Sequence, residues 1–173
     1  MSRSDEVRCV MRLPRFVPML FGLLVIGRPA GSQESVGRSV QGYAFFAPGF
    51  RPSDGTGTYS VGAGANWLIG SKFAVGLDGH VFGWWECSSC GAFVFTGNAG
   101  FLQRRQVPAD KWEPFALVGI GGAAVEGGGI GVAAFSGGTN YWIRERLALR
   151  FEGRYEYVFD EEGYVHLRVG VVF

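Results

Sequence analysis

The clearest pattern in the sequence is a strict two-residue alternation between Arg146 and Phe159. Alternation with period two puts successive side chains on opposite faces of a β-strand, whereas a helix would mix the two sets. One face of this strand is apolar and largely aromatic, and the other carries charges of alternating sign. The apolar set is Leu147, Leu149, Phe151, Gly153, Tyr155, Tyr157 and Phe159, and the other set is Ala148, Arg150, Glu152, Arg154 and Glu156.

Two kinds of sheet contain such a strand. In a soluble eight-stranded barrel of the lipocalin type, the aromatic face would point inward and enclose an apolar ligand. In an outer-membrane barrel, the aromatic face would contact lipid and the charged face would fill the interior. The rest of the chain must distinguish these two arrangements.

Period-two patterns and turn residues divide the chain into eight predicted strands. Each has about ten residues or more, the length that a tilted strand needs to cross a bilayer. Strands of soluble proteins more often have about five or six residues. No apolar run of about 18 residues follows the first thirty, so no mature transmembrane helix is predicted. The strands are Ser39 to Pro48, Thr58 to Ile69, Phe73 to Trp84, Ala92 to Gln103, Trp112 to Ala124, Gly131 to Ile143, Arg146 to Phe159 and Tyr164 to Phe173.

The connections between these strands alternate in character. Two of the three even-numbered connections are tight turns, at Gly70 to Lys72 and at Arg144-Glu145, and the odd-numbered ones are rich in glycine and acids. Bacterial outer-membrane barrels have short turns on the periplasmic side and longer loops outside. The predicted outer loops are Gly49 to Gly57, Trp85 to Gly91, Glu126 to Ile130 and Asp160 to Gly163.

An internal repeat supports the hairpin assignment. Residues 64–80 match residues 138–154 without a gap at an offset of 74, which superposes Asp78 on Glu152 and His80 on Arg154. Equivalent strands therefore keep an acid and a base on the same face. The two halves of the chain are predicted to be copies of one two-hairpin unit that closes on itself.

Composition favours the membrane alternative. Of the 173 residues, 18% are charged, which is low against about a quarter in ordinary soluble domains. Lys72 and Lys111 are the only lysines. Because soluble surfaces normally use many lysines, their scarcity indicates an exterior that mostly faces lipid.

Residues 1–31 are predicted to be a cleavable signal peptide, followed by one barrel domain at 32–173. Four arginines precede an apolar run from Met19 to Gly27, and small residues follow from Ala30. Both Met1 and Met11 fit the start of such a signal. Its removal takes away five arginines and two acids and leaves 11 basic and 13 acidic residues, a net charge of −2. Nothing in this balance indicates a nucleic-acid partner.

At this level the chain resembles the OmpA-type family of eight-stranded outer-membrane β-barrels, also called porin-like barrel domains. The resemblance is carried by Trp112 to Gly122, by Tyr141 to Tyr157 and by the closing segment His166 to Phe173. It covers the whole mature chain and implies an antiparallel up-and-down transmembrane barrel. It also implies Sec-type export to the outer membrane of a Gram-negative-type bacterium. The terminal Phe173 is similar to the family's assembly signal, which the barrel insertion machinery reads.

The polar faces of three predicted strands carry the residues that are expected to line the interior. We call these eight residues the lumen network. Its acids and bases are balanced, and a buried charge is tolerable when it is paired. The members are Asp78, His80, Arg150, Glu152, Arg154, Glu156, His166 and Arg168.

The sequence offers no catalytic motif. His80 and His166 are the only histidines, and a lipid-modifying barrel enzyme would need a Ser or Asp beside a His near the outer rim. His166 is followed by Leu167 and Arg168, so the His-x-Ser pattern of barrel lipid A deacylases does not occur. The prediction is a protein that is not an enzyme, with no cofactor and no metal site.

Cys87 and Cys90 fall within a predicted outer loop. In an exported chain, two such cysteines favour a disulfide, and free thiols are the alternative. A zinc site would need further ligands, which the neighbouring sequence does not provide.

These observations predict a structural or surface-interaction role, with outer-membrane lipid as surroundings and a possible surface ligand on the outer loops. Eight strands enclose an interior about wide enough for side chains, so a large channel is not expected. The alternative is a small diffusion pore, because the inward Gly62, Gly64, Gly76 and Gly170 would leave room for water. A lipid-modifying barrel enzyme and a lipocalin-like binder are further alternatives.

Overall fold

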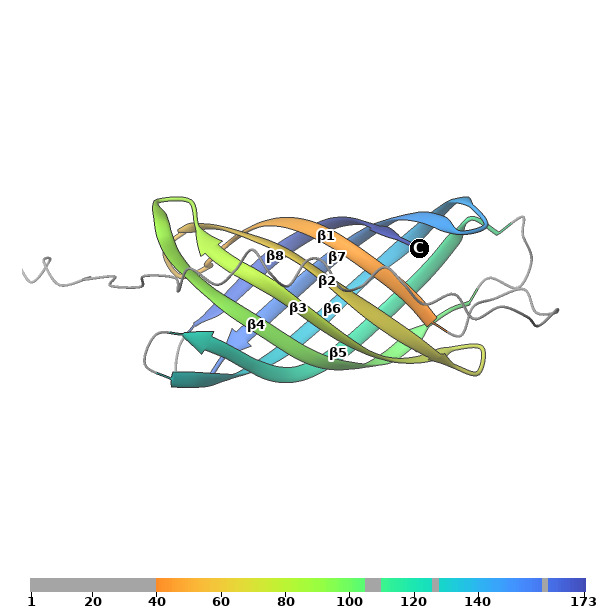
Figure 1. Ribbon diagram of the computed structural model, residues 1–173, viewed down its shortest axis with the longest axis horizontal. Coiled ribbons are helices and arrows are strands. Elements are labelled where there is room, and N and C mark those ends of the chain that lie inside the picture. Colours follow the sequence, from red (N-terminus) through yellow and green to blue (C-terminus); the bar gives the residue numbers. More distant parts are fainter. Residues whose placement is uncertain (1–39, 105–109, 126–127, 160–161) are drawn as a thin grey trace, which may run out of the picture.

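The computed structural model describes residues 40–104, 110–125, 128–159 and 162–173. The predicted signal peptide at 1–31 lies outside these residues. The described chain is a closed barrel in which each strand pairs antiparallel with its neighbours in sequence, and the first strand pairs with the last (Figure 1). The strands are β1 (Val40–Phe50), β2 (Gly57–Ile69), β3 (Phe73–Trp84), β4 (Cys87–Leu102), β5 (Trp112–Val125), β6 (Gly128–Arg144), β7 (Leu147–Val158) and β8 (Gly163–Val172).

The predicted all-β fold with eight antiparallel strands is therefore confirmed. Within the described ranges, no helix has the length and apolar character needed to cross a membrane. β2, β3, β5, β7 and β8 keep their predicted bounds to within one residue, and β1, β4 and β6 differ from the prediction by more at one end.

Strands extend into all four predicted outer loops, and in two of these loops the strand takes up most of the predicted residues. β4 already begins at Cys87, which pairs with Trp84, whereas the next pair joins Gly83 to Gly91. The extra residues between these pairs form an irregularity of the bulge type, which lets the ladder continue after a local shift. β6 likewise begins at Gly128, within the predicted loop Glu126 to Ile130. Glycine is a poor strand former on its own, so the sequence did not reveal this extension.

The two ends of the barrel differ. The end with the β2–β3 and β6–β7 connections, here called the turn end, also carries the start of β1 and the C-terminus (Figure 1). There Gly42 and Phe173 exchange two backbone hydrogen bonds of 3.1 and 2.9 Å. Gly70 has a φ of 68°, a value that glycine adopts without strain and that closes the β2–β3 turn. The opposite end, with the connections after β1, β3, β5 and β7, is called the loop end.

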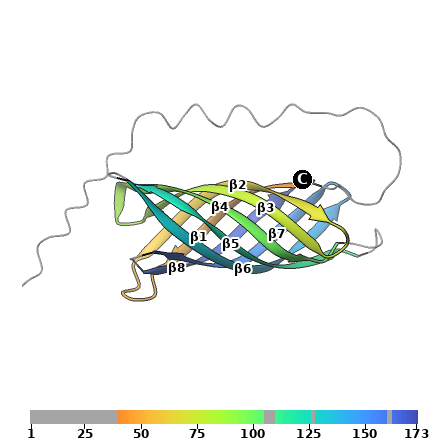
Figure 2. The ribbon, with the colours of Figure 1, turned by 90° about the horizontal axis from the view of Figure 1, so that it is seen from below.

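The barrel wall has an apolar outer face and a polar inner face, as the alternation predicts. On β7, Phe151, Tyr155 and Tyr157 lie on the outside and are 44%, 40% and 41% exposed, whereas Arg150 and Arg154 are buried. The lipocalin-like alternative required these aromatic side chains inside, so it is wrong. The tilted strands wrap continuously around the barrel in the view turned by 90° (Figure 2).

The internal repeat is visible in the strand registers. Asn66 pairs with Gly76 on the β2–β3 hairpin, and Asn140 pairs with Arg150 on β6–β7, again at an offset of 74. Because β3 and β7 are four strands apart in a closed barrel of eight, they lie on opposite walls. The repeated acid and base positions therefore face each other across the interior.

Along the barrel axis, the interior has a charged layer with a buried apolar cluster on either side of it. On β7 the inward side chains run from Ala148 at the turn end through Arg150, Glu152, Arg154 and Glu156 to Val158. One buried apolar cluster lies toward the loop end, and another lies toward the turn end, where polar side chains are also buried. The loop-end cluster is Phe82, Val94, Ala123, Val132 and Tyr164, and the turn-end cluster is Ala74, Leu102, Phe115 and Leu117.

Candidate functional site in the barrel interior

The structure places all eight residues of the lumen network inside the barrel. Each is at most 5% exposed, and together they come from three strands. β3 contributes Asp78 and His80, β7 contributes Arg150, Glu152, Arg154 and Glu156, and β8 contributes His166 and Arg168.

Arg154 links opposite walls of the barrel. Its Nη1 donates to Asp78 Oδ2 on β3 at 2.9 Å, and its Nε donates to Glu156 Oε1 on its own strand at 2.6 Å. Its Nη2 donates to Thr96 Oγ1 on β4 at 2.7 Å. A guanidinium whose nitrogens all donate hydrogen bonds has a fixed orientation, so the Arg154 side chain is held across the interior in one position.

Arg168 brings β8 into the same cluster of charges. Its Nη2 lies 3.2 Å from Glu156 Oε1, and its Nη1 lies 3.6 Å from Asp78 Oδ2 and 3.7 Å from Glu152 Oε1. Its guanidinium carbon is 4.0 Å from the centre of the Phe45 ring, a cation–π distance. Three carboxylates thus surround two arginines in the middle of the barrel.

Arg150 forms the part of the network nearest the turn end. Its Nε donates to Glu152 Oε2 at 2.8 Å. The guanidinium carbon lies 3.9 Å from the centre of the Phe115 ring and 4.4 Å from that of Tyr43. Aromatic side chains therefore cover the charged layer on this side.

The two histidines contact the carboxylates rather than a hydroxyl nucleophile. His80 Nε2 lies 3.3 Å and His166 Nε2 lies 3.7 Å from Glu156 Oε2, and His80 Nδ1 lies 3.6 Å from Asp78 Oδ1. Among the residues that the structure describes, no Ser or Thr hydroxyl is hydrogen-bonded to either ring. The arrangement is that of an ion-pair cluster and not of a nucleophile paired with its base.

Sequence reasoning missed Glu113, which is 1% exposed on β5. Its carboxylate accepts hydrogen bonds from Gln41 Nε2 at 3.1 Å, Asn140 Nδ2 at 2.9 Å and Trp142 Nε1 at 3.2 Å. Asn140 Oδ1 in turn accepts from Arg150 Nη1 at 3.4 Å, which connects Glu113 to the lumen network. The only signal in the sequence was its even spacing from the inward Phe115 and Leu117.

The inward glycines do not leave the space for water that the pore alternative required. A Cβ added at Gly62 would lie 2.8 Å from the Phe45 ring, and one at Gly64 would lie 2.5 Å from the Tyr43 hydroxyl. Both aromatic side chains come from β1 and occupy the volume that the glycines vacate. Close packing from a neighbouring strand therefore fills the space beside these two glycines, where the sequence predicted room for water.

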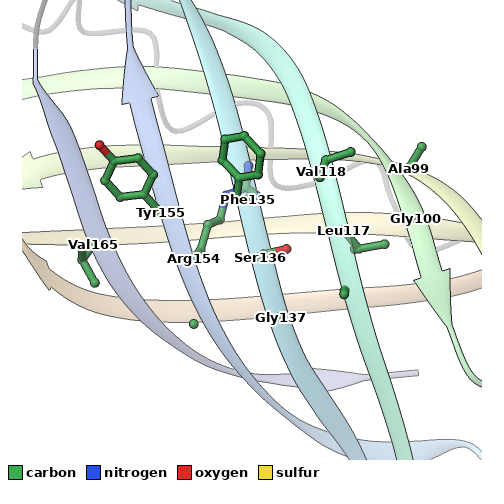
Figure 3. Close-up of a pocket in the computed structure, with 12 residues that line it drawn as sticks. Ala99, Gly100, Leu117, Val118, Phe135, Ser136, Gly137, Arg154, Tyr155 and Val165 are labelled. Carbon is green, nitrogen blue, oxygen red and sulfur yellow. The ribbon is translucent and has the colours of Figure 1, made fainter.

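The outer wall has a shallow groove of about 540 Å³ over β4 to β8. Gly137 and Gly153, which line it, are paired on β6 and β7. Phe135 and Tyr155 are also paired and lie side by side in Figure 3. Because small residues are flanked by aromatic ones, the groove is a depression in the apolar belt. It brings no set of acid, base and nucleophile together.

The described residues at the loop end carry a disulfide and a small charge cluster. Cys87 and Cys90 are joined by a disulfide, with their Cα atoms 5.3 Å apart. Arg51 is paired with Asp54, and its Nε lies 3.6 Å from Glu162 Oε2. The hydrogen bond from Arg51, helped by the backbone N–H of Thr56, holds the pKa of Asp54 below its usual value. In the described part of the chain, no three His, Cys, Asp or Glu side chains are grouped so that they could hold a metal ion.

A closed eight-stranded barrel with an apolar exterior and a charged interior is the architecture of outer-membrane β-barrels. Comparison with known structures gives the same class. Neisserial surface protein A is 18% identical, with 77% of this chain and 94% of that chain covered and a TM-score of 0.55. The N-terminal β-barrel domain of Pseudomonas aeruginosa OprF is 13% identical, with coverages of 78% and 96% and a TM-score of 0.59.

The outer membrane enzyme PagL is also similar, at 14% identity, coverages of 76% and 98% and a TM-score of 0.53. The attachment invasion locus protein Ail of Yersinia pestis, in complex with the heparin analogue sucrose octasulfate, is 13% identical, with coverages of 78% and 97% and a TM-score of 0.50. At these identities the likeness shows the fold. No family model matches the chain, and no curated protein matches it.

Proposed function

We propose that this chain is an OmpA-type barrel of the outer membrane of a Gram-negative-type bacterium, with a structural or surface-interaction role and a closed interior. The apolar belt supports the location, since side chains such as Ile120 and Leu167 are 75% and 63% exposed. A surface of this kind is stable in lipid and a liability in water.

The observation that carries the closed interior is the ion pair between Arg154 and Asp78. It joins opposite walls at 2.9 Å, and both side chains are almost inaccessible. A permeating ion would have to displace this pair and leave a buried charge without its partner, which is strongly unfavourable. Apolar clusters above and below the charged layer close the interior further.

We assign the surface role to the loop end, because the sequence of its loops is acidic. The four predicted outer loops contain six acids and one arginine. Complementary charge steers and selects partners, so this end favours a cationic segment of another surface molecule. The sulfated compound bound by Ail is anionic, whereas the acidic loops of this chain favour a cationic partner. We therefore propose a different ligand chemistry for this chain. The charged residues are Arg51, Asp54, Glu86, Glu126, Asp160, Glu161 and Glu162.

Insertion would use the C-terminal segment of β8 and Phe173. Val169, Val171 and Phe173 lie on the outer face and are 50%, 41% and 53% exposed. An alternating apolar segment that ends in an aromatic residue is a feature that the barrel insertion machinery could bind. A catalytic role is not part of the proposal, because neither histidine has a hydroxyl partner within the described residues.

Planar-bilayer recordings test the closed interior. Purified wild-type protein is expected to give little or no conductance. Replacing both Arg150 and Arg154 by Ala should open the charged layer and increase conductance. The matched control replaces two exposed residues by Ala, Arg144 at the end of β6 and Arg146 in the β6–β7 turn, and should leave conductance unchanged. Large, stable openings of the wild-type protein would overturn the closed interior and favour the diffusion pore.

Fractionation tests the location independently. The protein is expected in the outer-membrane fraction and should migrate differently on a gel before and after heating, as a folded barrel does. Recovery in the soluble fraction would contradict the proposed location without bearing on the interior.

A further inference from the structure

The two ends of the barrel carry opposite charge. Among the described residues, the connections and strand ends of the turn end contain five bases and two acids, Asp110 and Glu145. The described connections of the loop end contain three acids and one base, Arg51. The five bases of the turn end, which we call the basic collar, are Lys72, Arg104, Lys111, Arg144 and Arg146.

The charge of the basic collar is not neutralised within the described part of the chain. Four of its members are exposed, and Arg104 is partly buried. None of the five forms an ion pair with a described carboxylate. The single base of the loop end, in contrast, is already paired with Asp54 and lies 3.6 Å from Glu162. The turn end therefore presents unpaired positive charge, which attracts anions.

Arg104 lacks an acceptor for one of its donors. Its Nε is shielded from solvent, and no described group accepts a hydrogen bond from it. The backbone N–H of Arg104 donates to Ser71 O at 3.2 Å, which holds Arg104 beside Lys72 on the neighbouring hairpin. Shielded donors are normally satisfied, so an oxygen acceptor from outside the described chain is expected here. Phosphate oxygens match the donor geometry of a guanidinium.

Aromatic side chains place the basic collar at the membrane surface. Trp112 follows Lys111 directly and is 61% exposed, and its ring lies 4.7 Å from that of Tyr141 on β6. The backbone N–H of Trp142 donates to Lys111 O at 2.8 Å, which ties Lys111 to the same pair of strands. Exposed Trp and Tyr side chains of barrels lie at the level of the lipid headgroups. The basic collar therefore lies at the depth of the lipid phosphates.

The loop end shows that the aromatic pair alone does not require a basic neighbour. Trp85 is 59% exposed there, and its ring lies 5.0 Å from that of Tyr59. The residue after Trp85 is the exposed Glu86. Both ends thus carry an aromatic pair at headgroup level, and the two pairs differ in the sign of the charge beside them. Only the turn end suits a headgroup with net negative charge.

We propose that the basic collar is a binding surface for the headgroups of anionic phospholipids in the leaflet that surrounds the turn end. Lysine and arginine at a membrane surface attract anionic lipid, and the phosphate would supply the acceptor that Arg104 lacks. This inference rests on the outer-membrane location proposed above, and it is independent of the ligand of the loop end.

Lipid retention tests the binding surface. The barrel is refolded into phosphatidylcholine vesicles that contain phosphatidylglycerol as the minor lipid and is extracted in a mild non-ionic detergent. Native mass spectrometry then counts the lipids that stay bound. Phosphatidylglycerol should be enriched about threefold or more over its share in the vesicles. Replacing Lys72, Arg104, Lys111 and Arg144 together by Gln should bring the ratio back to that of the vesicles.

The matched control exchanges lysine and arginine at the same four positions and keeps the charge. It should retain the enrichment, and a loss equal to that of the Gln variant would overturn the assignment to charge. A wild-type barrel that inserts without enriching phosphatidylglycerol would overturn this inference and leave the location standing. A wild-type protein that does not insert, as judged by the absence of heat-modifiable migration, would overturn both.

Tryptophan fluorescence compares the two ends of the barrel directly. One variant keeps Trp112 and has Phe at Trp67, Trp84 and Trp85, and the other keeps Trp85 and has Phe at Trp67, Trp84 and Trp112. Both keep the buried Trp142. Phosphatidylglycerol brominated in its upper acyl chains should quench the Trp112 variant more strongly than brominated phosphatidylcholine at the same mole fraction. The Trp85 variant should show no such preference. A preference at both ends, or at neither, would contradict a binding surface at the turn end.

Discussion

Arg154 and Tyr155 are neighbours on β7 and lie in opposite surroundings. Arg154 is 3% exposed and has fixed partners on β3, β4 and β7, whereas Tyr155 is 40% exposed on the outer wall. The outer position requires only that the side chain be compatible with lipid. The inner position requires a particular charge at a particular place. The two faces of one strand are therefore specified by different physics, solvation outside and pairing inside.

The largest expected effect comes from breaking the pairing on the inner face. Arg154→Ala should destabilise the barrel by about 3–5 kcal/mol, because it leaves buried carboxylates at Asp78 and Glu156 without their partner. Urea unfolding of the protein refolded into lipid vesicles measures the change. Arg146→Ala, at an exposed turn position, is the control and should be nearly neutral. A loss below about 1 kcal/mol for Arg154→Ala would mean that the inner face does not depend on pairing.

A somewhat smaller effect is expected from a charge on the outer face. Tyr155→Arg should cost about 2–4 kcal/mol if the position lies near the middle of the bilayer, and less toward the interface. Tyr155→Phe keeps the face apolar and should be tolerated. The yield of folded barrel and its unfolding in vesicles are the readouts. Normal insertion and stability of Tyr155→Arg would show that this face does not contact lipid.

The smallest effect is expected for the Arg51–Asp54 ion pair, which is exposed to water at the loop end. Arg51 lowers the pKa of Asp54 below the ordinary value of 3.8, so the contact is fully present above about pH 4 and is lost as the pH falls through the lowered pKa. Arg51→Ala should return the pKa of Asp54 toward 3.8 and leave unfolding of the barrel unchanged. The carboxyl carbon shift of Asp54 in an NMR titration checks this. An unchanged titration in the variant would show that the pair does not form in solution.

Much of the fold could be predicted because alternation is a local property. On β7, the contrast between aromatic and charged positions fixes both the strand and its two faces. The repeat at an offset of 74 also predicted equivalent hairpins, and their registers agree. On β4 the strand continues beyond its clear alternation to Cys87, where the ladder shifts, so its start could not be found from the pattern.

The parts of the interior that the sequence did not predict depend on contacts between side chains of different strands. On β5, Phe115 and Leu117 point inward while Val118 and Ile120 point outward. Since both faces are apolar there, polarity does not identify the inward face, and Glu113 could not be placed. The volume beside Gly62 and Gly64 likewise is filled by Phe45 and Tyr43 from another strand. No local pattern reports which neighbour occupies such a space.

The pairing of Asp78 with Arg154 also has a consequence for how the wall closes during assembly. If β7 slipped by one residue against its neighbours, every arginine and glutamate on it would turn toward lipid. A slip by two residues would keep the faces but put Arg154 about 6 to 7 Å away along the strand from its position opposite Asp78. The ion pair across the interior therefore favours one register, because Asp78 and Arg154 neutralise each other only when the two halves are aligned in that way.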